Sequence, residues 1–310
     1  MTRAAVPDYG YAYERLFETA QLWLRDDYVE RYRDFTVACN PSSRSRLEFT
    51  IARARDAFLP HLTHTDLMYV TAEIAEGFGI AAAKVPPAWF LEREQTLPKR
   101  GFAWLGHPWK HTATDFVWRG ISWLPFRRAR VDDEGAYLID IPSGEEEGLV
   151  FCFWAELEKT LLPVTQIQWR YGQRMDEAYA EAHATLLNEA AGYAKMALAA
   201  LLFEFCAQRI VKQESKQPPR HVRRRHGLGA QPRPITVIVL RHLEHDKRSL
   251  DHNQHETDIQ WTCRWIVGGH WRDQWYPSRG RHRPKWIAPY IKGPEDRPLV
   301  GRDRVFRVAR

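Results

Sequence analysis

The stretch Val150-Phe151-Cys152-Phe153-Trp154 decides the fold, because every residue in it is apolar. A strand with apolar side chains on both of its faces has to be covered on both sides, so we expect it to be central in a sheet. The acidic run Glu145-Glu146-Glu147 just before it has to be solvated and is typical of a turn.

Three neighbouring segments also have strand composition and are separated by turn residues. Together with the central strand, the expected strands span residues 116–124, 136–141, 149–154 and 164–171. The turns between them are rich in Asp, Gly and Pro. This pattern predicts a four-stranded, mostly antiparallel sheet.

Helical periodicity dominates the rest of the first two thirds of the chain. Expected helices span residues 9–39, as one or two amphipathic helices, then 46–59, 65–77 and 176–213. In the last of these, apolar residues recur at intervals of three and four, which predicts a buried face lying across the sheet. The fold class we expect is therefore α+β, with helices packed on a mostly antiparallel sheet and followed by a small basic β-rich C-terminal unit.

Charge divides the 310-residue chain unequally. The total net charge is +6, but residues 216–310 hold 21 Lys+Arg against 9 Asp+Glu, whereas the remainder holds 24 against 30. We expect an acidic α+β domain at 1–212, a basic Pro/Arg linker at 213–234 and a basic Trp/Arg-rich β unit at 235–310. A basic part beside an acidic one favours either a polyanion partner or a contact between the two parts.

The cellular setting is predicted from two simple features. The four cysteines are far apart in sequence, which is typical of a reduced, cytoplasmic protein. The N-terminus lacks the apolar core of a signal peptide, and the longest apolar run, 196–203, is far shorter than the roughly 20 residues of a membrane-spanning helix. We expect no membrane association.

The expected linker contains a cluster of basic residues, Arg223, Arg224 and Arg225. One hypothesis is a solvated hinge, since the segment has almost nothing to bury and its like charges repel. The other is an arm that becomes ordered on nucleic acid.

The most distinctive stretch, 258–289, interleaves aromatic and basic residues. Flat rings can stack on unpaired bases and cations can bind phosphates, so this pattern favours RNA. The candidate residues here are His270, Trp271, Arg272, Trp275, Arg279, Arg281, Arg283 and Lys285. The alternative is a small β unit, with strands at 235–241, 258–267, 285–288 and 304–308, whose tryptophans fill its core and stack on arginines internally. We expect Trp286 to be core and Trp271 to be partly exposed.

Two other constellations could carry chemistry. The loop with His242, His245, His252 and His255 offers nitrogen ligands for a divalent metal, but the spacing matches no standard zinc signature and a polar loop between two strands explains it without metal, so we expect no cofactor. His270 could act as a general base oriented by Asp273 or Asp258, but no nucleophile accompanies it, and a structural histidine is the simpler interpretation.

The residues Val267-Gly268-Gly269-His270-Trp271, the basic turn at 279–285 and Trp286-Ile287-Ala288-Pro289 resemble a family of phage and mobile-element proteins related to a type V-A anti-CRISPR. The resemblance covers only residues 220–309. It implies a regulator associated with RNA or the ribosome, of the kind that recognises a nascent polypeptide and depletes its transcript.

These features lead to one principal hypothesis and two alternatives. The principal one is a non-enzymatic regulatory protein whose basic C-terminal unit binds RNA or a ribosome-associated polyanion, while the N-terminal domain binds a protein or nascent polypeptide. The first alternative is a metal-dependent hydrolase or nuclease that uses the histidine loop at 242–255. The second is a structural protein-interaction module.

Overall fold

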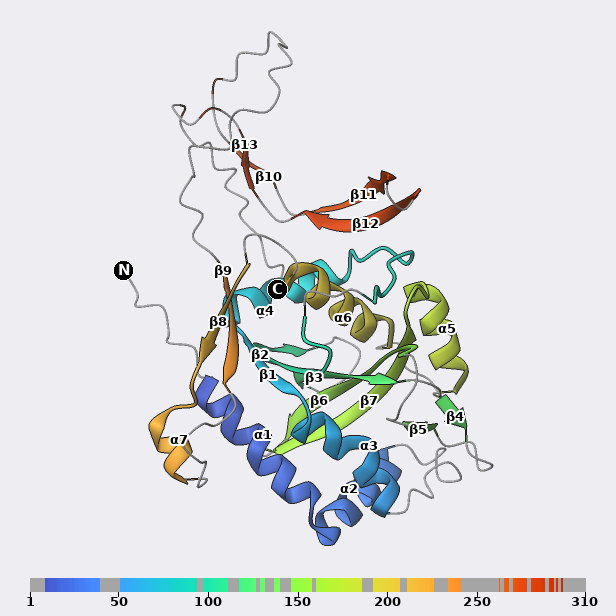
Figure 1. Ribbon diagram of the computed structural model, residues 1–310, viewed down its shortest axis with the longest axis vertical. Coiled ribbons are helices and arrows are strands. Elements are labelled where there is room, and N and C mark those ends of the chain that lie inside the picture. Colours follow the sequence, from blue (N-terminus) through green and yellow to red (C-terminus); the bar gives the residue numbers. More distant parts are fainter. Residues whose placement is uncertain are drawn as a thin grey trace, which may run out of the picture. The chain divides into compact units, whose positions relative to one another are not determined.

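A seven-stranded mixed sheet forms the centre of this computed structural model (Figure 1). The structure describes residues 9–39, 51–93, 97–110, 117–126, 129–131, 137–139, 146–157, 160–185, 192–206, 211–225, 234–240, 262, 265–267, 270–277, 280–287, 290–292, 294 and 297. The sheet has the strand order β7-β6-β3-β2-β1-β9-β8. Its strands are β1 (Asp66–Val70), β2 (Gly101–Lys110), β3 (Val117–Phe126), β6 (Gly148–Leu157), β7 (Thr160–Arg170), β8 (Val211–Lys216) and β9 (Ile235–Leu240).

The strand that we expected to be central is β6, which pairs antiparallel with β3 on one side and with β7 on the other. Residues 148–155 are all buried, so both faces of β6 are covered as its apolar sequence predicts. The pairs β2–β3 and β8–β9 are also antiparallel, and only β1 runs parallel to its neighbours β2 and β9. The predicted α+β class with a mostly antiparallel sheet is confirmed.

Helices cover both faces of the sheet. The helices are α1 (Tyr9–Trp23), α2 (Asp26–Cys39), α3 (Ile51–Thr63), α4 (Ala72–Ala82), α5 (Met175–Thr185), α6 (Gly192–Cys206) and α7 (Arg220–Arg225). On one face, Leu16 and Trp23 of α1 join a core with Trp104 and Trp154 of the sheet. On the other face, Phe203 of α6 contacts sheet aromatics. Because residues 195–204 of α6 are all buried, the predicted core role of this apolar segment is confirmed.

Three expected elements of the first unit differ from the structure in type, number or pairing. Residues 137–139 form β5, which pairs with β4 (Ala129–Val131) outside the main sheet. The helix predicted at 65–77 is instead strand β1 followed by α4, because Leu67-Met68-Tyr69-Val70 is an apolar run buried between two parallel neighbours. The helix predicted at 176–213 is two helices, α5 and α6, followed by strand β8.

The chain divides into two compact units, Met1–Leu240 and Arg241–Arg310. Strand β9, which we expected in the C-terminal unit, lies inside the main sheet, and the expected linker contains the last four residues of β8 and all of α7. Counted by these units, the first holds 30 Lys+Arg and 30 Asp+Glu and the second holds 15 and 9. The excess positive charge therefore belongs to the second unit, and the first unit is neutral rather than acidic.

Within the described part of the chain, no helix is both long and apolar enough to cross a membrane. Two cysteines there, Cys152 and Cys206, are buried free thiols. Burial raises the pKa of both, to about 12 for Cys206, so neither is a reactive thiolate at neutral pH.

Candidate nucleic-acid interface

The interleaved aromatic and basic residues of the C-terminal unit form a β-hairpin. Its strands are β11 (His270–Tyr276) and β12 (Arg281–Ile287), paired antiparallel without a register shift from His270↔Ile287 to Tyr276↔Arg281. At the turn, the Gly280 backbone N–H donates to the Pro277 carbonyl oxygen at 3.3 Å, and Gly280 has a φ of +57°. A left-handed residue at this position favours glycine. A second, shorter pair in the same unit joins β10 (Trp265–Val267) and β13 (Tyr290–Lys292).

The pleat of the hairpin places its tryptophans on one face and its Arg and Lys side chains on the other. Successive side chains of a strand point to opposite sides, and residues directly opposite in an antiparallel pair share a side. One face therefore holds Trp271, Asp273, Trp275, His282, Pro284 and Trp286. The other holds His270, Arg272, Gln274, Tyr276, Arg281, Arg283, Lys285 and Ile287. Residues that alternate in the sequence are thus separated in space.

Two ring pairs organise the aromatic face. Trp271 and Trp286 lie edge to face with their ring centroids 5.5 Å apart, and only 7% of Trp286 is exposed. Trp271 is half-buried. Both predictions for these two tryptophans, Trp286 as core and Trp271 as partly exposed, are confirmed. Near the turn, the Trp275 ring lies 5.0 Å from that of His282 and remains 45% exposed.

The basic face brings like charges directly opposite one another. Arg272 of β11 pairs in register with Lys285 of β12, and Arg281 and Arg283 lie on the same face. Arg272 and Arg281 are exposed, whereas Arg283 and Lys285 are half-buried. Like charges at directly opposed positions destabilise a strand pair, so this face has an electrostatic cost that a bound anion would remove. Arg279 lies outside the described residues.

Asp273 has a different histidine partner from the one proposed from sequence. Its carboxylate oxygen Oδ2 lies 3.5 Å from Nδ1 of His282 in the opposite strand. His270 is exposed and lies on the other face, at the opposite end of β11 from the turn. The idea that Asp273 orients His270 as a general base is therefore wrong, because the pleat separates the two side chains. Asp258 lies outside the described residues.

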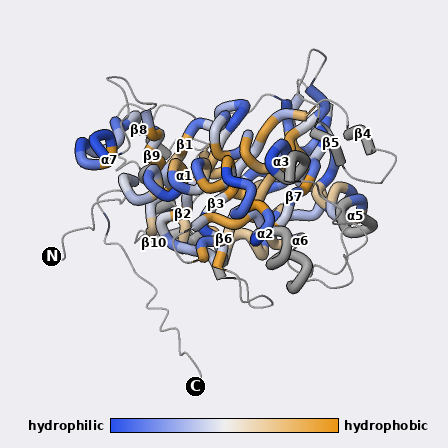
Figure 2. The backbone as a smooth tube through the Cα atoms, turned by 90° about the horizontal axis from the view of Figure 1, so that it is seen from below, coloured by the Kyte–Doolittle hydropathy of each residue, from blue (hydrophilic) through white to orange (hydrophobic). Residues whose placement is uncertain are grey.

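Arg223, Arg224 and Arg225 belong to the first unit, where α7 packs on α1. Val222 of α7 is fully buried, and Nη1 of Arg225 lies 3.2 Å from Oε1 of the buried Glu14 in α1. Arg224 and Arg225 are exposed, and Figure 2 shows α7 as a mainly hydrophilic segment. Sequence reasoning missed this helix because its only apolar side chain is Val222.

The histidine loop with His242, His245, His252 and His255 lies outside the described residues. Where the structure does place the chain, no group of three or more His, Cys, Asp or Glu side chains is arranged to hold a metal ion.

A buried polar cluster in the first unit was not predicted. Nδ1 of His61 lies 2.8 Å from Oγ of Ser122, which accepts a hydrogen bond of 2.7 Å from Nε1 of Trp154. His61 and Ser122 are both 0% exposed, and burial lowers the pKa of His61 to about 3. A Ser–His contact suggests nucleophilic catalysis, but a substrate cannot reach this one, so the cluster is structural.

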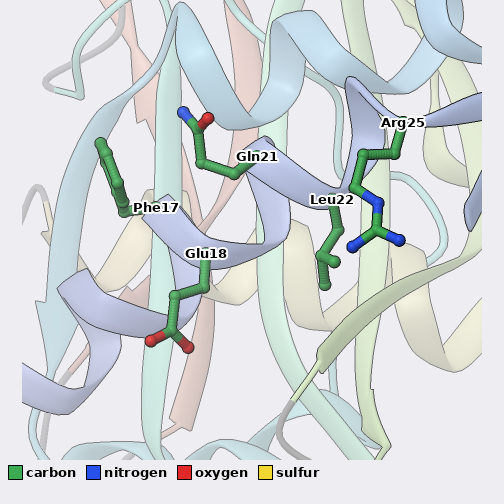
Figure 3. A pocket seen from close by; sticks show the side chains of 5 residues that line it. All are labelled: Phe17, Glu18, Gln21, Leu22 and Arg25. Atoms are coloured by element: carbon green, nitrogen blue, oxygen red, sulfur yellow. The ribbon is translucent and has the colours of Figure 1, made fainter.

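A hollow on the outer side of α1 is lined by Phe17, Glu18, Gln21, Leu22 and Arg25 (Figure 3). Nη2 of Arg25 lies 2.7 Å from a carboxylate oxygen of Asp27. Helix α1 and Arg25 just beyond its end supply the whole lining, so this hollow lacks the polar groups that converge from several elements in a binding site.

The fold and the hairpin define an α+β protein with helices on both faces of a mixed sheet and a separate β unit that presents one basic face. Comparison with known proteins adds little to this. No protein-family model and no curated protein matches the chain. A search of solved structures finds the crystal structure of AcrVA2, with 12% sequence identity, a TM-score of 0.40, and coverage of 92% of this chain and 98% of that chain. This is a distant structural relationship, and it carries no argument about function.

Proposed function

We propose that this chain is a non-enzymatic regulatory protein of the anti-CRISPR-like kind that its C-terminal sequence resembles, and that it binds single-stranded RNA through the β11–β12 hairpin. The observation that carries the proposal is the basic face of the hairpin. Four cationic side chains, Arg272, Arg281, Arg283 and Lys285, share that face, and Asp273 lies on the other one.

The chemistry of this face fits a phosphate backbone. Arginine guanidinium groups donate paired hydrogen bonds to phosphate oxygens, and a lysine adds a compact positive charge. The spacing of alternate residues along a strand is about 6.8 Å, close to the distance between successive phosphates in an extended single strand. A backbone laid along this face would neutralise the opposed pair of Arg272 and Lys285.

The turn end of the hairpin supplies a stacking surface. Trp275 is the large apolar side chain of the C-terminal unit that is exposed in the described residues. Stacking of a base on an aromatic side chain contributes about 1 to 3 kcal/mol and tolerates any base. Trp275 lies on the face opposite the cations, but a two-stranded hairpin is narrow. An RNA strand whose phosphates follow the basic face can therefore turn one base past the edge of the hairpin and stack it on Trp275.

The cluster on α7 provides a second candidate contact. Arg223, Arg224 and Arg225 belong to a helix that Val222 and Glu14 fix to the first unit. Their guanidinium groups can contact phosphate independently of the hairpin.

Salt-dependent binding tests the proposal. We would titrate a fluorescein-labelled nine-nucleotide oligouridylate with the full chain and follow anisotropy at several salt concentrations. The double substitution Arg272→Gln/Lys285→Gln should weaken binding and reduce the slope of log K against log salt by about 1.4, since each phosphate contact to a single strand contributes about 0.7.

The matched control removes two exposed charges from the first unit, as Arg31→Gln/Lys84→Gln. It should leave both the affinity and the slope unchanged. Equal slopes for the wild type and the hairpin variant would remove this face from the interface, and absence of any binding at low salt would refute RNA binding altogether.

A further inference from the structure

Asp273 is an acidic residue within a hairpin whose other charged side chains are basic. It belongs to the face that carries Trp275, two positions away along β11, and 68% of its side chain is exposed. A carboxylate repels phosphate, so its presence beside a stacking surface for nucleic acid is unfavourable unless it has a ligand of its own.

His282 lies next to both of these side chains. Nδ1 of His282 lies 3.5 Å from Oδ2 of Asp273, and the ring of His282 contacts that of Trp275 with centroids 5.0 Å apart. The histidine thus contacts the carboxylate and the tryptophan ring at the same time. An ionised carboxylate has about four acceptor sites on its two oxygens, so the contact with His282 leaves sites on both oxygens for a ligand.

The distance between Asp273 and Trp275 matches the size of a nucleobase. Residues two apart on one face of a strand are separated by about 6.8 Å. A base stacked on Trp275 therefore extends one of its edges to the carboxylate. Because unpaired bases expose their Watson–Crick edges, this edge is available for recognition.

Among the four RNA bases, guanine alone presents two adjacent donors on that edge, the N1–H and the exocyclic N2–H. Two adjacent donors match the two oxygens of a carboxylate. Adenine and cytosine place an acceptor next to their amino group, and uracil flanks its single N–H with two carbonyl oxygens. A carboxylate attracts the two adjacent donors of guanine, whereas it is repelled by the acceptors on the same edge of the other three bases.

We propose that Asp273 and Trp275 form a guanine-specific subsite at the turn end of the hairpin, with His282 as a positioning residue. The inference rests on the proposed RNA binding and names the base that this site prefers. The basic face supplies affinity without regard to sequence, and the subsite adds a preference for RNA that contains an unpaired guanine.

The test uses single-guanine probes and the full-length chain. We would measure the affinity of the wild type for fluorescein-labelled UUUUGUUUU, for the same oligonucleotide with inosine in place of guanosine, and for UUUUUUUUU. Inosine lacks only the exocyclic amine. The guanosine probe should bind about five- to tenfold more tightly than either of the others, which is the lower range for a bidentate contact to a base.

The variant Asp273→Asn should bind all three probes with equal affinity, because an amide cannot accept at both of its positions. Its affinity for UUUUUUUUU should match or exceed that of the wild type, since a negative charge is removed. The control Asp56→Asn removes an exposed carboxylate from α3 and should keep the guanine preference.

The possible outcomes separate the two proposals. If no probe binds, RNA binding itself is refuted, and the subsite with it. If the wild type binds all three probes equally, the subsite is refuted while RNA binding stands. A guanine preference that persists in Asp273→Asn also overturns the assignment, because another group must then recognise the base.

Discussion

Replacing the buried His61 should change how the stability of the first unit depends on pH. The side chain is 0% exposed, and burial lowers its pKa from 6.5 to about 3. The folded state therefore keeps His61 neutral where the unfolded chain would protonate it. Because the folded pKa lies below the unfolded value, the unfolded chain takes up the proton first as the pH falls, and stability present above pH 6.5 is lost between pH 6.5 and 3.

The size of the effect follows from the two pKa values. Each pH unit in this window costs about 1.4 kcal/mol, and lowering the pH from 7 to 5 costs about 2 kcal/mol from this one group. The substitution His61→Gln removes the titration and keeps an amide that can bond to Ser122 Oγ. The variant will be less stable at pH 7, but its loss between pH 7 and 5 should be smaller than that of the wild type by about 2 kcal/mol.

Urea unfolding followed by tryptophan fluorescence at pH 7, 6 and 5 measures this difference, since the tryptophans that are fully buried among the described residues lie in the first unit. His64→Gln is the matched control, because His64 is an exposed histidine just beyond the end of α3. Its pH dependence should equal that of the wild type. If His61→Gln loses as much stability as the wild type between pH 7 and 5, the argument that His61 is buried in its neutral form is refuted.

The remaining predictions concern packing. Gly148→Ala should destabilise the first unit by about 1 to 3 kcal/mol or more, seen as a lower Tm, because a Cβ there would lie 2.1 Å from the Trp169 carbonyl oxygen. Trp286→Ala should cost about 3 to 5 kcal/mol and abolish RNA binding together with the hairpin fold. Trp275→Ala should keep the hairpin folded, because the Trp271–Trp286 pair remains, and cost about 1 to 3 kcal/mol of binding. If the two tryptophan substitutions had equal effects on folding and on binding, the assignment of Trp286 to the core and of Trp275 to base stacking would be wrong.

Local sequence patterns were sufficient to predict the strands and helices whose packing partners are close to them in sequence. The apolar run of β6 predicted a strand covered on both faces, and its partners β3 and β7 are the strands before and after it in the main sheet. The helical structure of residues 9–39, expected as one or two helices, followed from their periodicity. In each case the residues that decide the structure lie within a few tens of positions of one another.

The parallel part of the sheet could not be predicted in this way. Strand β1 pairs with β9 through Met68↔Thr236 and Val70↔Ile238, across more than half of the chain. Leu67-Met68-Tyr69-Val70 continues into the helical period of α4, so local periodicity favoured one helix there. Ile235–Leu240 has the composition of a strand, but nothing in its own sequence indicates which sheet it joins.

The candidate site was predicted in composition but not in arrangement. The sequence shows aromatic and basic residues alternating, and only the register of the hairpin shows which of them share a face. A shift of one residue would have placed Trp271 opposite Lys285 and mixed the two faces.

The observed register has an energetic consequence that links stability to function. Opposed cations such as Arg272 and Lys285 weaken the strand pair, whereas the ring pairs Trp271–Trp286 and Trp275–His282 strengthen it by about 0.2 to 1 kcal/mol each. The aromatic face thus offsets the repulsion on the basic face, and a two-stranded hairpin has little stability beyond this. A ligand that binds the folded hairpin more tightly than the unfolded chain stabilises the hairpin by that difference in affinity. Binding and folding of this hairpin are therefore coupled. An anion that binds the basic face relieves the repulsion between its cations, and this relief adds to the free energy of binding.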